Sequence, residues 1–274
     1  MVFYGPPGTG KTYLAQEIAD HLTGRRPENT VLVQFHPAYS YEDFFEGYRP
    51  VATDDGRVAL ELRPGPFRRL VDRAAQDSAT PYVLIIDEIN RANLAKVFGE
   101  LYFLLEYRNR SVDLLYSSGD DRGFSLPRNV VILGTMNTAD RSIALVDAAM
   151  RRRFAFVELH PDTEPTRSLL DRWLARRGLP DTAARLLRAL NARIADRDFR
   201  IGPSYLMRER VHTHPRGLAQ VWRRSILPLL EEHHYGEGVD VEARYGLPVL
   251  CAELGIDLDA GDGSQDQPAG ENPA

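Results

Sequence analysis

The sequence contains little cysteine and almost no lysine, and it lacks long hydrophobic runs. Cys251 is the one cysteine among 274 residues, which excludes a disulfide framework and a cysteine-based zinc site and fits a reducing, cytoplasmic compartment. No apolar run approaches the roughly 20 residues needed to cross a bilayer, so no membrane contact is expected. The net charge of -5 and the isoelectric point near 5.8 argue against a protein that binds polyanions over its whole surface.

The scarcity of lysine singles out one position. Of the 34 basic residues only Lys11 and Lys96 are lysines, so 32 are arginine. A genomic preference for arginine codons accounts for most of this excess. A lysine that persists against such a preference is a candidate for a role that a planar guanidinium fills poorly, and Lys11 lies in the clearest motif of the chain.

Short apolar runs alternate with helical patterns through the first 160 residues. The five predicted strands begin at Val2, Val31, Tyr82, Val130 and Phe154. Apolar residues at helical spacing predict helices over 12–22, 66–75 and 94–105. This alternation predicts an α/β fold with a mostly parallel, five-stranded sheet flanked by helices.

The rest of the chain divides into smaller parts. Alternating patterns around glycines predict hairpin insertions in the core domain (1–160) near 48–63 and 111–126. Residues 161–258 carry helical patterns without a convincing strand, which predicts a small all-α lid domain. The acidic, low-complexity tail 259–274 is expected to be disordered.

A phosphate-binding loop is the strongest signal in the sequence. The run after the first strand matches G-x-x-x-x-G-K-[ST] and consists of Gly5, Pro6, Pro7, Gly8, Thr9, Gly10, Lys11 and Thr12. The backbone N–H groups of such a loop and the helix N-terminus bind phosphates. Lys11 is expected to contact the β- and γ-phosphates of a nucleoside triphosphate, and the Thr12 hydroxyl is expected to bind Mg²⁺.

Two carboxylates follow the third predicted strand. Asp87 and Glu88 come directly after the apolar run 82–86. Asp87 is expected to hold Mg²⁺ together with Thr12, and Glu88 is expected to act as the base that polarises the attacking water. Two solvated acids at a strand end are the alternative. The phosphate-binding loop about 70 residues earlier favours the catalytic interpretation.

Two further features could complete the site. Asn137 follows the fourth predicted strand, where an amide could orient the lytic water, although an ordinary turn asparagine is the alternative. Arg152 and Arg153 precede the fifth strand and are candidates for a finger that a neighbouring subunit inserts beside the γ-phosphate. A solvated basic run is the alternative for these arginines.

These elements in this order, followed by a helical domain, are similar to an AAA+ ATPase, and three strings resemble the McrB family more closely. The strings are FHPAYSYEDFFEGYRP (35–50), DEINRAN (87–93) and MNTADRS (136–142). A fourth segment, ILPLLEE (226–232), is similar to part of the lid of that family. The resemblance extends over about residues 1–235.

The resemblance implies a function as well as a fold. McrB proteins are the motor subunits of modification-dependent DNA restriction systems, so it implies an NTPase that hydrolyses GTP or ATP with Mg²⁺ at the interfaces of a ring, usually a hexamer. A McrC-like partner would stimulate hydrolysis and carry the nuclease. Asn137, Asp140 and Arg141 would belong to the loop that arranges the water and senses this partner.

The sequence leaves the route to DNA, the lid arginine and the cellular role open. The sequence begins four residues before the phosphate-binding loop, so DNA would be reached only through a partner or a domain that is not in it. Arg200 and Arg208 are candidates for a lid arginine that contacts the γ-phosphate, and the favoured alternative is that both are ordinary surface arginines. The rival to a restriction motor is a MoxR- or dynein-like ATPase that remodels proteins, and a third possibility is a fragment that binds nucleotide without assembling.

Overall fold

The computed structural model describes residues 1–116, 123–140 and 148–257. These residues form two compact units. The first unit comprises Met1–Gly5 and Gly10–Leu159, and the second comprises Pro6–Thr9 and the chain from His160 onward. The segment Pro6–Thr9 of the phosphate-binding loop therefore packs with the second unit.

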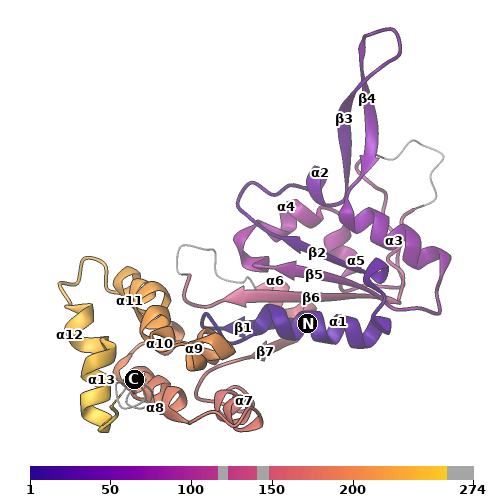
Figure 1. Ribbon diagram of the computed structural model, residues 1–274. Coiled ribbons are helices and arrows are strands. Elements are labelled where there is room, and N and C mark those ends of the chain that lie inside the picture. Colours follow the sequence, from indigo (N-terminus) through magenta and orange to yellow (C-terminus); the bar gives the residue numbers. More distant parts are fainter. Residues whose placement is uncertain (117–122, 141–147, 258–274) are drawn as a thin grey trace, which may run out of the picture. The chain divides into compact units, whose positions relative to one another are not determined.

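A parallel, five-stranded sheet forms the centre of the first unit (Figure 1). Its strands are β1 (Val2–Gly5), β2 (Thr30–Gln34), β5 (Tyr82–Asp87), β6 (Val130–Asn137) and β7 (Phe156–Glu158). The spatial order is β2-β5-β6-β1-β7, which confirms the predicted fold class. Because all strands run the same way, β1, β5 and β6 end at one edge of the sheet, where ligands bind in folds of this kind.

Helices cover both faces of this sheet. Helix α1 (Lys11–Thr23) packs Ala15 and Ala19 on the face that carries Val83 and Ile85. Helix α3 (Pro66–Gln76) and the short helix α2 (Tyr41–Phe44) pack on the face that carries Leu84. Successive residues of β5 thus point to opposite faces, and both faces are buried, which explains its continuous apolar run.

The helix predicted over 94–105 is wrong in one respect, because the structure breaks it into two. Helix α4 (Leu94–Phe98) ends at Gly99, and helix α5 (Leu101–Leu104) follows. Gly99 has φ 52° and ψ -132°, a conformation that interrupts the helix and that other residues rarely adopt. The apolar pattern survives the break, since Phe98 and Leu101 are both buried in the core.

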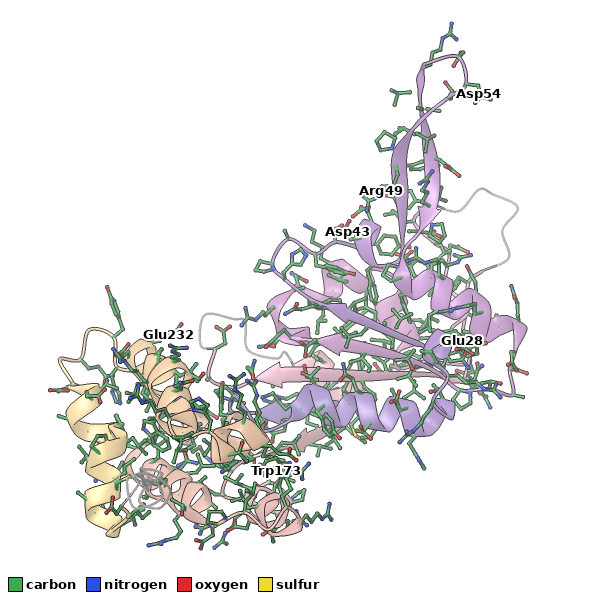
Figure 2. All side chains as sticks on the ribbon, in the orientation of Figure 1. Glu28, Asp43, Arg49, Asp54, Trp173 and Glu232 are labelled. Carbon is green, nitrogen blue, oxygen red and sulfur yellow. The ribbon has the colours of Figure 1, made fainter. Side chains whose placement is uncertain are left out.

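A two-stranded hairpin extends from the first unit. Strands β3 (Glu46–Ala52) and β4 (Val58–Pro64) pair antiparallel, and near the start of β3 Arg49 Nη2 lies 2.6 Å from Asp43 Oδ1 (Figure 2). In the second predicted insertion the described residues form one isolated antiparallel bridge, between Val112 and Phe124. Residues 117–122 of that insertion lie outside the described residues.

The described part of the second unit is helical. Its helices are α7 (Leu169–Arg176), α8 (Thr182–Arg193), α9 (Glu209–Thr213), α10 (Gly217–Val221), α11 (Leu227–His233), α12 (Val241–Tyr245) and α13 (Leu247–Leu254). A π-helical turn joins α10 to α11 and contains Trp222, whose Nε1 donates to the carbonyl oxygen of Tyr245 at 2.9 Å. Both side chains lie in one apolar core, which gives this unit its own stability. The tail 259–274 lies outside the described residues.

Candidate nucleotide-binding site

The phosphate-binding loop joins β1 to α1, as its sequence predicts. Gly8 and Gly10 have φ of 77° and 88°, values that residues with a Cβ rarely adopt. At Gly5 a Cβ would lie 2.1 Å from the carbonyl oxygen of Leu159, so this position has no room for a side chain. The glycines of the motif are thus explained by backbone geometry alone.

Lys11 is buried at the start of α1. Its side chain donates from Nζ to the carbonyl oxygen of Gly5 at 3.0 Å, and only 7% of the residue is exposed. Burial lowers the pKa of Lys11 to about 8, although the negative charges of Glu88 and Asp87 act in the opposite direction. A buried ammonium in this state gains from a further anion, and phosphate oxygens would supply it. Lys96, in contrast, is exposed.

Asp87 accepts two hydroxyl hydrogen bonds at the end of β5. Thr12 Oγ1 donates to Asp87 Oδ1 at 2.8 Å, and Thr135 Oγ1 donates to the same oxygen. The Thr12 and Asp87 oxygens therefore lie together, and hard oxygen ligands of this kind fit Mg²⁺. No group of three or more histidine, cysteine or acidic residues suited to a metal occurs among the described residues.

Thr135 is a site residue that the sequence reasoning missed. Besides donating to Asp87, its Oγ1 accepts the backbone N–H of Glu88 at 3.3 Å, and only 2% of the residue is exposed. One hydroxyl thus fixes both acidic residues relative to β6. The available signal was a polar residue inside an apolar strand, two positions before Asn137 and so on the same face.

Glu88 and Asn137 are in direct contact. Asn137 Nδ2 donates to Glu88 Oε1, so the amide occupies one oxygen of the carboxylate. Glu88 Oε2 is buried and has no hydrogen-bond partner among the described residues. Glu88 also has φ 54°, an uncommon conformation for a residue with a side chain, and such conformations cluster at functional sites. This oxygen, which forms an ion pair with Arg91 but accepts no hydrogen bond from the described residues, can accept a proton from a water molecule.

Arg91 connects Glu88 to the loop after β6. Its Nε lies 3.5 Å from Glu88 Oε2, and its Nη2 lies 2.9 Å from Asp140 Oδ2. Asp140 is therefore tied to the carboxylate that the sequence predicts as the base. Arg141, predicted to act in the same loop, lies outside the described residues. We refer to Lys11, Thr12, Asp87, Glu88, Thr135 and Asn137 together as the strand-end cluster.

The structure separates the two finger candidates at the end of α6 (Ala148–Arg153). Arg153 Nη2 forms an ion pair with Glu106 Oε2 at 3.0 Å, and its guanidinium lies 4.4 Å from the Tyr102 ring centre. Only 15% of the Arg153 side chain is exposed. Arg152 is exposed and forms no ion pair with the described residues. Of the two, Arg152 is the one that a neighbouring molecule can reach.

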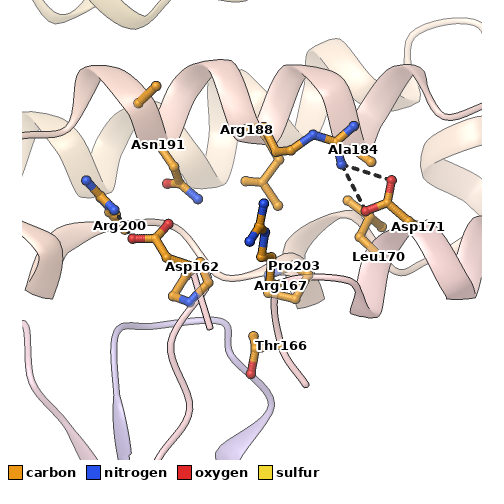
Figure 3. Close-up of a pocket in the computed structure, with 13 residues that line it drawn as sticks. Asp162, Thr166, Arg167, Leu170, Asp171, Ala184, Arg188, Asn191, Arg200 and Pro203 are labelled. Atoms are coloured by element: carbon orange, nitrogen blue, oxygen red, sulfur yellow. Dashed lines mark hydrogen bonds and ion pairs between the residues drawn. The ribbon is translucent and has the colours of Figure 1, made fainter. Parts of the chain in front are cut away.

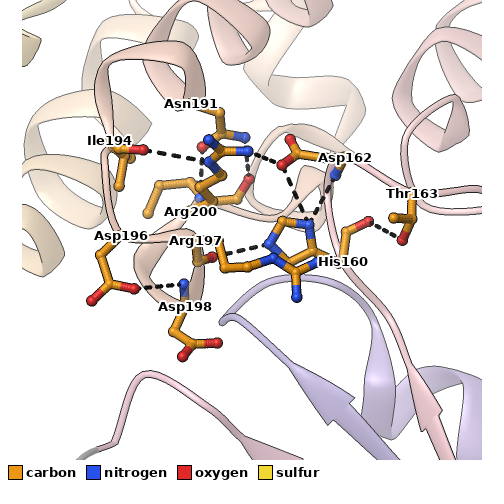
Figure 4. A network of polar contacts seen from close by, with 10 residues as sticks. His160, Asp162, Thr163, Asn191, Ile194, Asp196, Arg197, Asp198 and Arg200 are labelled. Atoms are coloured by element: carbon orange, nitrogen blue, oxygen red, sulfur yellow. Dashed lines mark hydrogen bonds and ion pairs between the residues drawn. The ribbon is translucent and has the colours of Figure 1, made fainter.

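Of the two candidate lid arginines, Arg200 is paired with a carboxylate and Arg208 is exposed. Arg200 forms an ion pair with Asp162 and donates from Nε to the carbonyl oxygen of Ile194 at 3.4 Å (Figure 4). Arg208 is exposed at the start of α9. The second unit also has a cavity of about 430 Å³ in which Arg188 binds both carboxylate oxygens of Asp171 (Figure 3). Of the residues predicted for the site, Arg200 lines this cavity, and no residue of the phosphate-binding loop or of the strand ends does.

Comparison with known proteins identifies the family. The family model described as AAA domain (dynein-related subfamily) matches residues 1–154, and the model described as McrB, alpha-helical lid domain matches residues 182–242. The chain belongs to the AAA family. It is a McrB-like AAA protein, since the helical domain that follows its AAA domain is of the McrB type.

Two curated relatives of this McrB-like AAA protein come from restriction systems. The Type IV methyl-directed restriction enzyme EcoKMcrB subunit of Escherichia coli (strain K12) is 40% identical over 253 residues, 86% of this chain and 54% of that protein. The Type II restriction enzyme BsuMI component YdiS of Bacillus subtilis (strain 168) is 32% identical over 63% of this chain and 60% of that protein. The chain thus spans little more than half of either relative.

The McrB-like chain shows no membrane-spanning element in its described residues. Every helix among them is too short or too polar to cross a bilayer.

Proposed function

We propose that this chain is the nucleotide-hydrolysing motor of a McrBC-type DNA restriction or defence system. Its AAA domain and McrB-type lid support the NTPase class, and the restriction role is taken from its two relatives. The observation that carries the hydrolytic part is the position of Glu88. Asn137 holds its Oε1, and its Oε2 is paired with Arg91 but accepts no hydrogen bond from the described residues.

Five residues of the strand-end cluster take a direct part in this reaction, and the sixth, Thr135, fixes Asp87 and Glu88 in place. The backbone N–H groups of the loop and Lys11 hold the phosphates of GTP or ATP. Thr12 and Asp87 would hold Mg²⁺, which would neutralise charge on the phosphates. Glu88 accepts the proton of the attacking water, and Asn137 orients that water. Asp140 and Arg141 set the loop that responds to a partner.

The active form in this proposal is a ring, with a hexamer as the expected size, in the cytoplasm. Arg152 of one subunit would reach the γ-phosphate held by the next subunit, because it is the exposed arginine of the pair. A McrC-like nuclease subunit would stimulate hydrolysis, and DNA would be engaged through that partner or through a further domain.

The central experiment measures hydrolysis of GTP and ATP by the full chain, with Mg²⁺ and with EDTA. We expect hydrolysis of at least one nucleotide, which ceases in EDTA and is stimulated by a McrC-like subunit encoded by a neighbouring gene. Lys11→Ala should lose nucleotide binding. Absence of binding in the unaltered protein would contradict the proposal.

A protein-remodelling ATPase is the second candidate, because the matching AAA model is described as dynein-related. Its catalytic residues would be the same, so the strand-end cluster favours neither role. The McrB-type lid favours the restriction motor. Affinity purification of Glu88→Gln with nucleotide decides between them: a nuclease subunit supports the restriction role, and a protein client without a nuclease supports remodelling.

A further inference from the structure

Backbone hydrogen bonds connect the lid to the phosphate-binding loop within the second unit. The N–H of Gly202 donates to the carbonyl oxygen of Pro7 at 2.9 Å, and the N–H of Ser204 donates to that of Gly8 at 2.9 Å. Gly202 and Ser204 belong to the sequence IGPSYL, which contains the 3₁₀ turn Pro203–Leu206. Two consecutive carbonyl groups of the loop are therefore satisfied by the lid.

The approach is too close for a side chain at Gly202. A Cβ there would lie 2.1 Å from the Gly8 carbonyl carbon and 2.4 Å from the Thr9 nitrogen. The φ of Gly202 is -77°, which any residue adopts, so only the contact with the loop requires glycine.

Tyr205 covers the same stretch of the loop. A Cβ on Gly8 would lie 2.4 Å from Cε2 of the Tyr205 ring, so the ring rests directly on this glycine. Tyr205 is half-buried, and burial raises the pKa of its phenol, which stays neutral at physiological pH. The ring adds shape and no charge to the contact.

The lid side of this contact is held firmly. Asn191, buried in α8, donates from Nδ2 to the carbonyl oxygen of Ile201 at 2.9 Å and accepts the N–H of Ile201 at Oδ1 at 2.8 Å. His160 Nε2 lies 3.0 Å from the carbonyl oxygen of Arg197, and Arg200 is paired with Asp162 (Figure 4). The backbone that leads into Gly202 is thus fixed before it meets the loop.

We infer that Gly202, Ser204 and Tyr205 are positioning residues that hold the phosphate-binding loop in its nucleotide-accepting shape. With the Pro7 and Gly8 carbonyls bonded to the lid, the peptide planes are set so that N–H groups of the loop remain available for phosphate. The inference rests on the proposed nucleotide site. It gives the lid a role in nucleotide affinity that requires no arginine.

The test compares two pairs of variants by nucleotide affinity. Gly202→Ala places a Cβ against the loop, whereas Gly217→Ala, its control, places one 2.5 Å from the carbonyl oxygen of Arg210 inside the lid. Tyr205→Ala removes the ring from Gly8. Its control Trp173→Ala removes another half-buried lid aromatic, labelled in Figure 2. The Trp173 ring contacts Arg177 and His212. The measurement is the Kd for fluorescent GTP and ATP analogues with Mg²⁺, alongside thermal melting.

We expect Gly202→Ala and Tyr205→Ala to raise Kd by about tenfold or more, which corresponds to the loss of about one hydrogen bond to a charged phosphate. Tyr205→Phe should bind within about threefold of the unaltered protein, because the ring remains, and a threefold change is under 1 kcal/mol. The two controls should lower the melting temperature without weakening nucleotide binding comparably.

Two results would overturn the inference. One is unchanged affinity in Tyr205→Ala, which decides the matter even where Gly202→Ala does not fold. The other is equal weakening in Trp173→Ala, because the effect would then be general loss of lid stability. Failure of the nucleotide site itself gives a different result, since the unaltered protein would then not bind nucleotide or Lys11→Ala would bind normally.

Discussion

The strand-end cluster and the lid segment Gly202–Tyr205 differ in the atoms that form their contacts. In the strand-end cluster the contacts run between side chains, as from Thr12 to Asp87 and from Asn137 to Glu88. In the lid segment two of the contacts run from backbone N–H groups to backbone carbonyls. A site built from side chains restricts residue types at fixed spacing and can be found as a motif. A site built from backbone groups limits only the size of the side chain at the point of contact, so a glycine is the one sign of it in the sequence.

Removal of the Arg152 side chain has the largest expected effect, and it tests whether the strand-end cluster needs an arginine from a neighbouring subunit. Arg152→Ala should reduce hydrolysis by about 10³-fold or more, the size seen when an arginine finger is removed. Its melting temperature should not change, because Arg152 is exposed and forms no ion pair with the described residues. Hydrolysis rates and melting curves of the isolated variant provide the measurement.

Arg153→Ala is the matched control from the same helix. It should lower the melting temperature, since Arg153 is mostly buried against Glu106 and Tyr102. Mixing Arg152→Ala with Glu88→Gln subunits should restore part of the activity, because a finger acts across an interface. Loss of hydrolysis in Arg153→Ala at unchanged stability, with normal Arg152→Ala, would reverse the assignment.

Glu88→Gln has the next largest expected effect. The substitution keeps the contact with Asn137 possible but removes the proton acceptor, so hydrolysis should fall by about 10²–10⁴-fold. Nucleotide binding should persist, which separates this residue from Lys11. The measurement is single-turnover hydrolysis together with Kd. Normal turnover in Glu88→Gln would show that another group accepts the proton.

Thr135 belongs to the strand-end cluster, although none of the sequence motifs contains it. Thr135→Val keeps the shape but removes the hydroxyl that contacts both Asp87 and Glu88, so hydrolysis should fall by about tenfold or more. Thr135→Ser keeps the hydroxyl and should restore most of the rate. Equal loss in both variants would mean that packing matters here and the hydroxyl does not.

The sequence predicted the sheet and the motif residues because both follow from local patterns along the chain. The apolar run of β5 follows from burial of both its faces, and Asp87 lies at its end whatever the rest of the fold does. The break at Gly99 escaped, because the apolar residues on either side continue the same helical stripe. Thr135 escaped because its role depends on β6 lying beside β5, which spacing alone does not reveal.

The lid contact escaped for a different reason. In the sequence IGPSYL the glycine is indistinguishable from an ordinary turn glycine, and Tyr205 from an ordinary core aromatic. Only the approach of Gly8 to within contact of both gives them a role. The sequence points to Arg200 instead, because a charged side chain is the more recognisable partner of a phosphate. The structure pairs that arginine with Asp162.

The smallest expected effect concerns pH. Without nucleotide the pKa of Lys11 is lowered to about 8 by burial, and bound phosphate should raise it, so binding takes up a proton above pH 8. Nucleotide affinity should therefore be constant below pH 8 and fall severalfold, at most about tenfold, between pH 8 and 9. Titration of Kd against pH measures this. Glu88→Gln should move the fall to lower pH, because the Glu88 charge raises the Lys11 pKa. An affinity that stays constant from pH 7 to 9.5 would mean that Lys11 remains fully protonated before nucleotide binds.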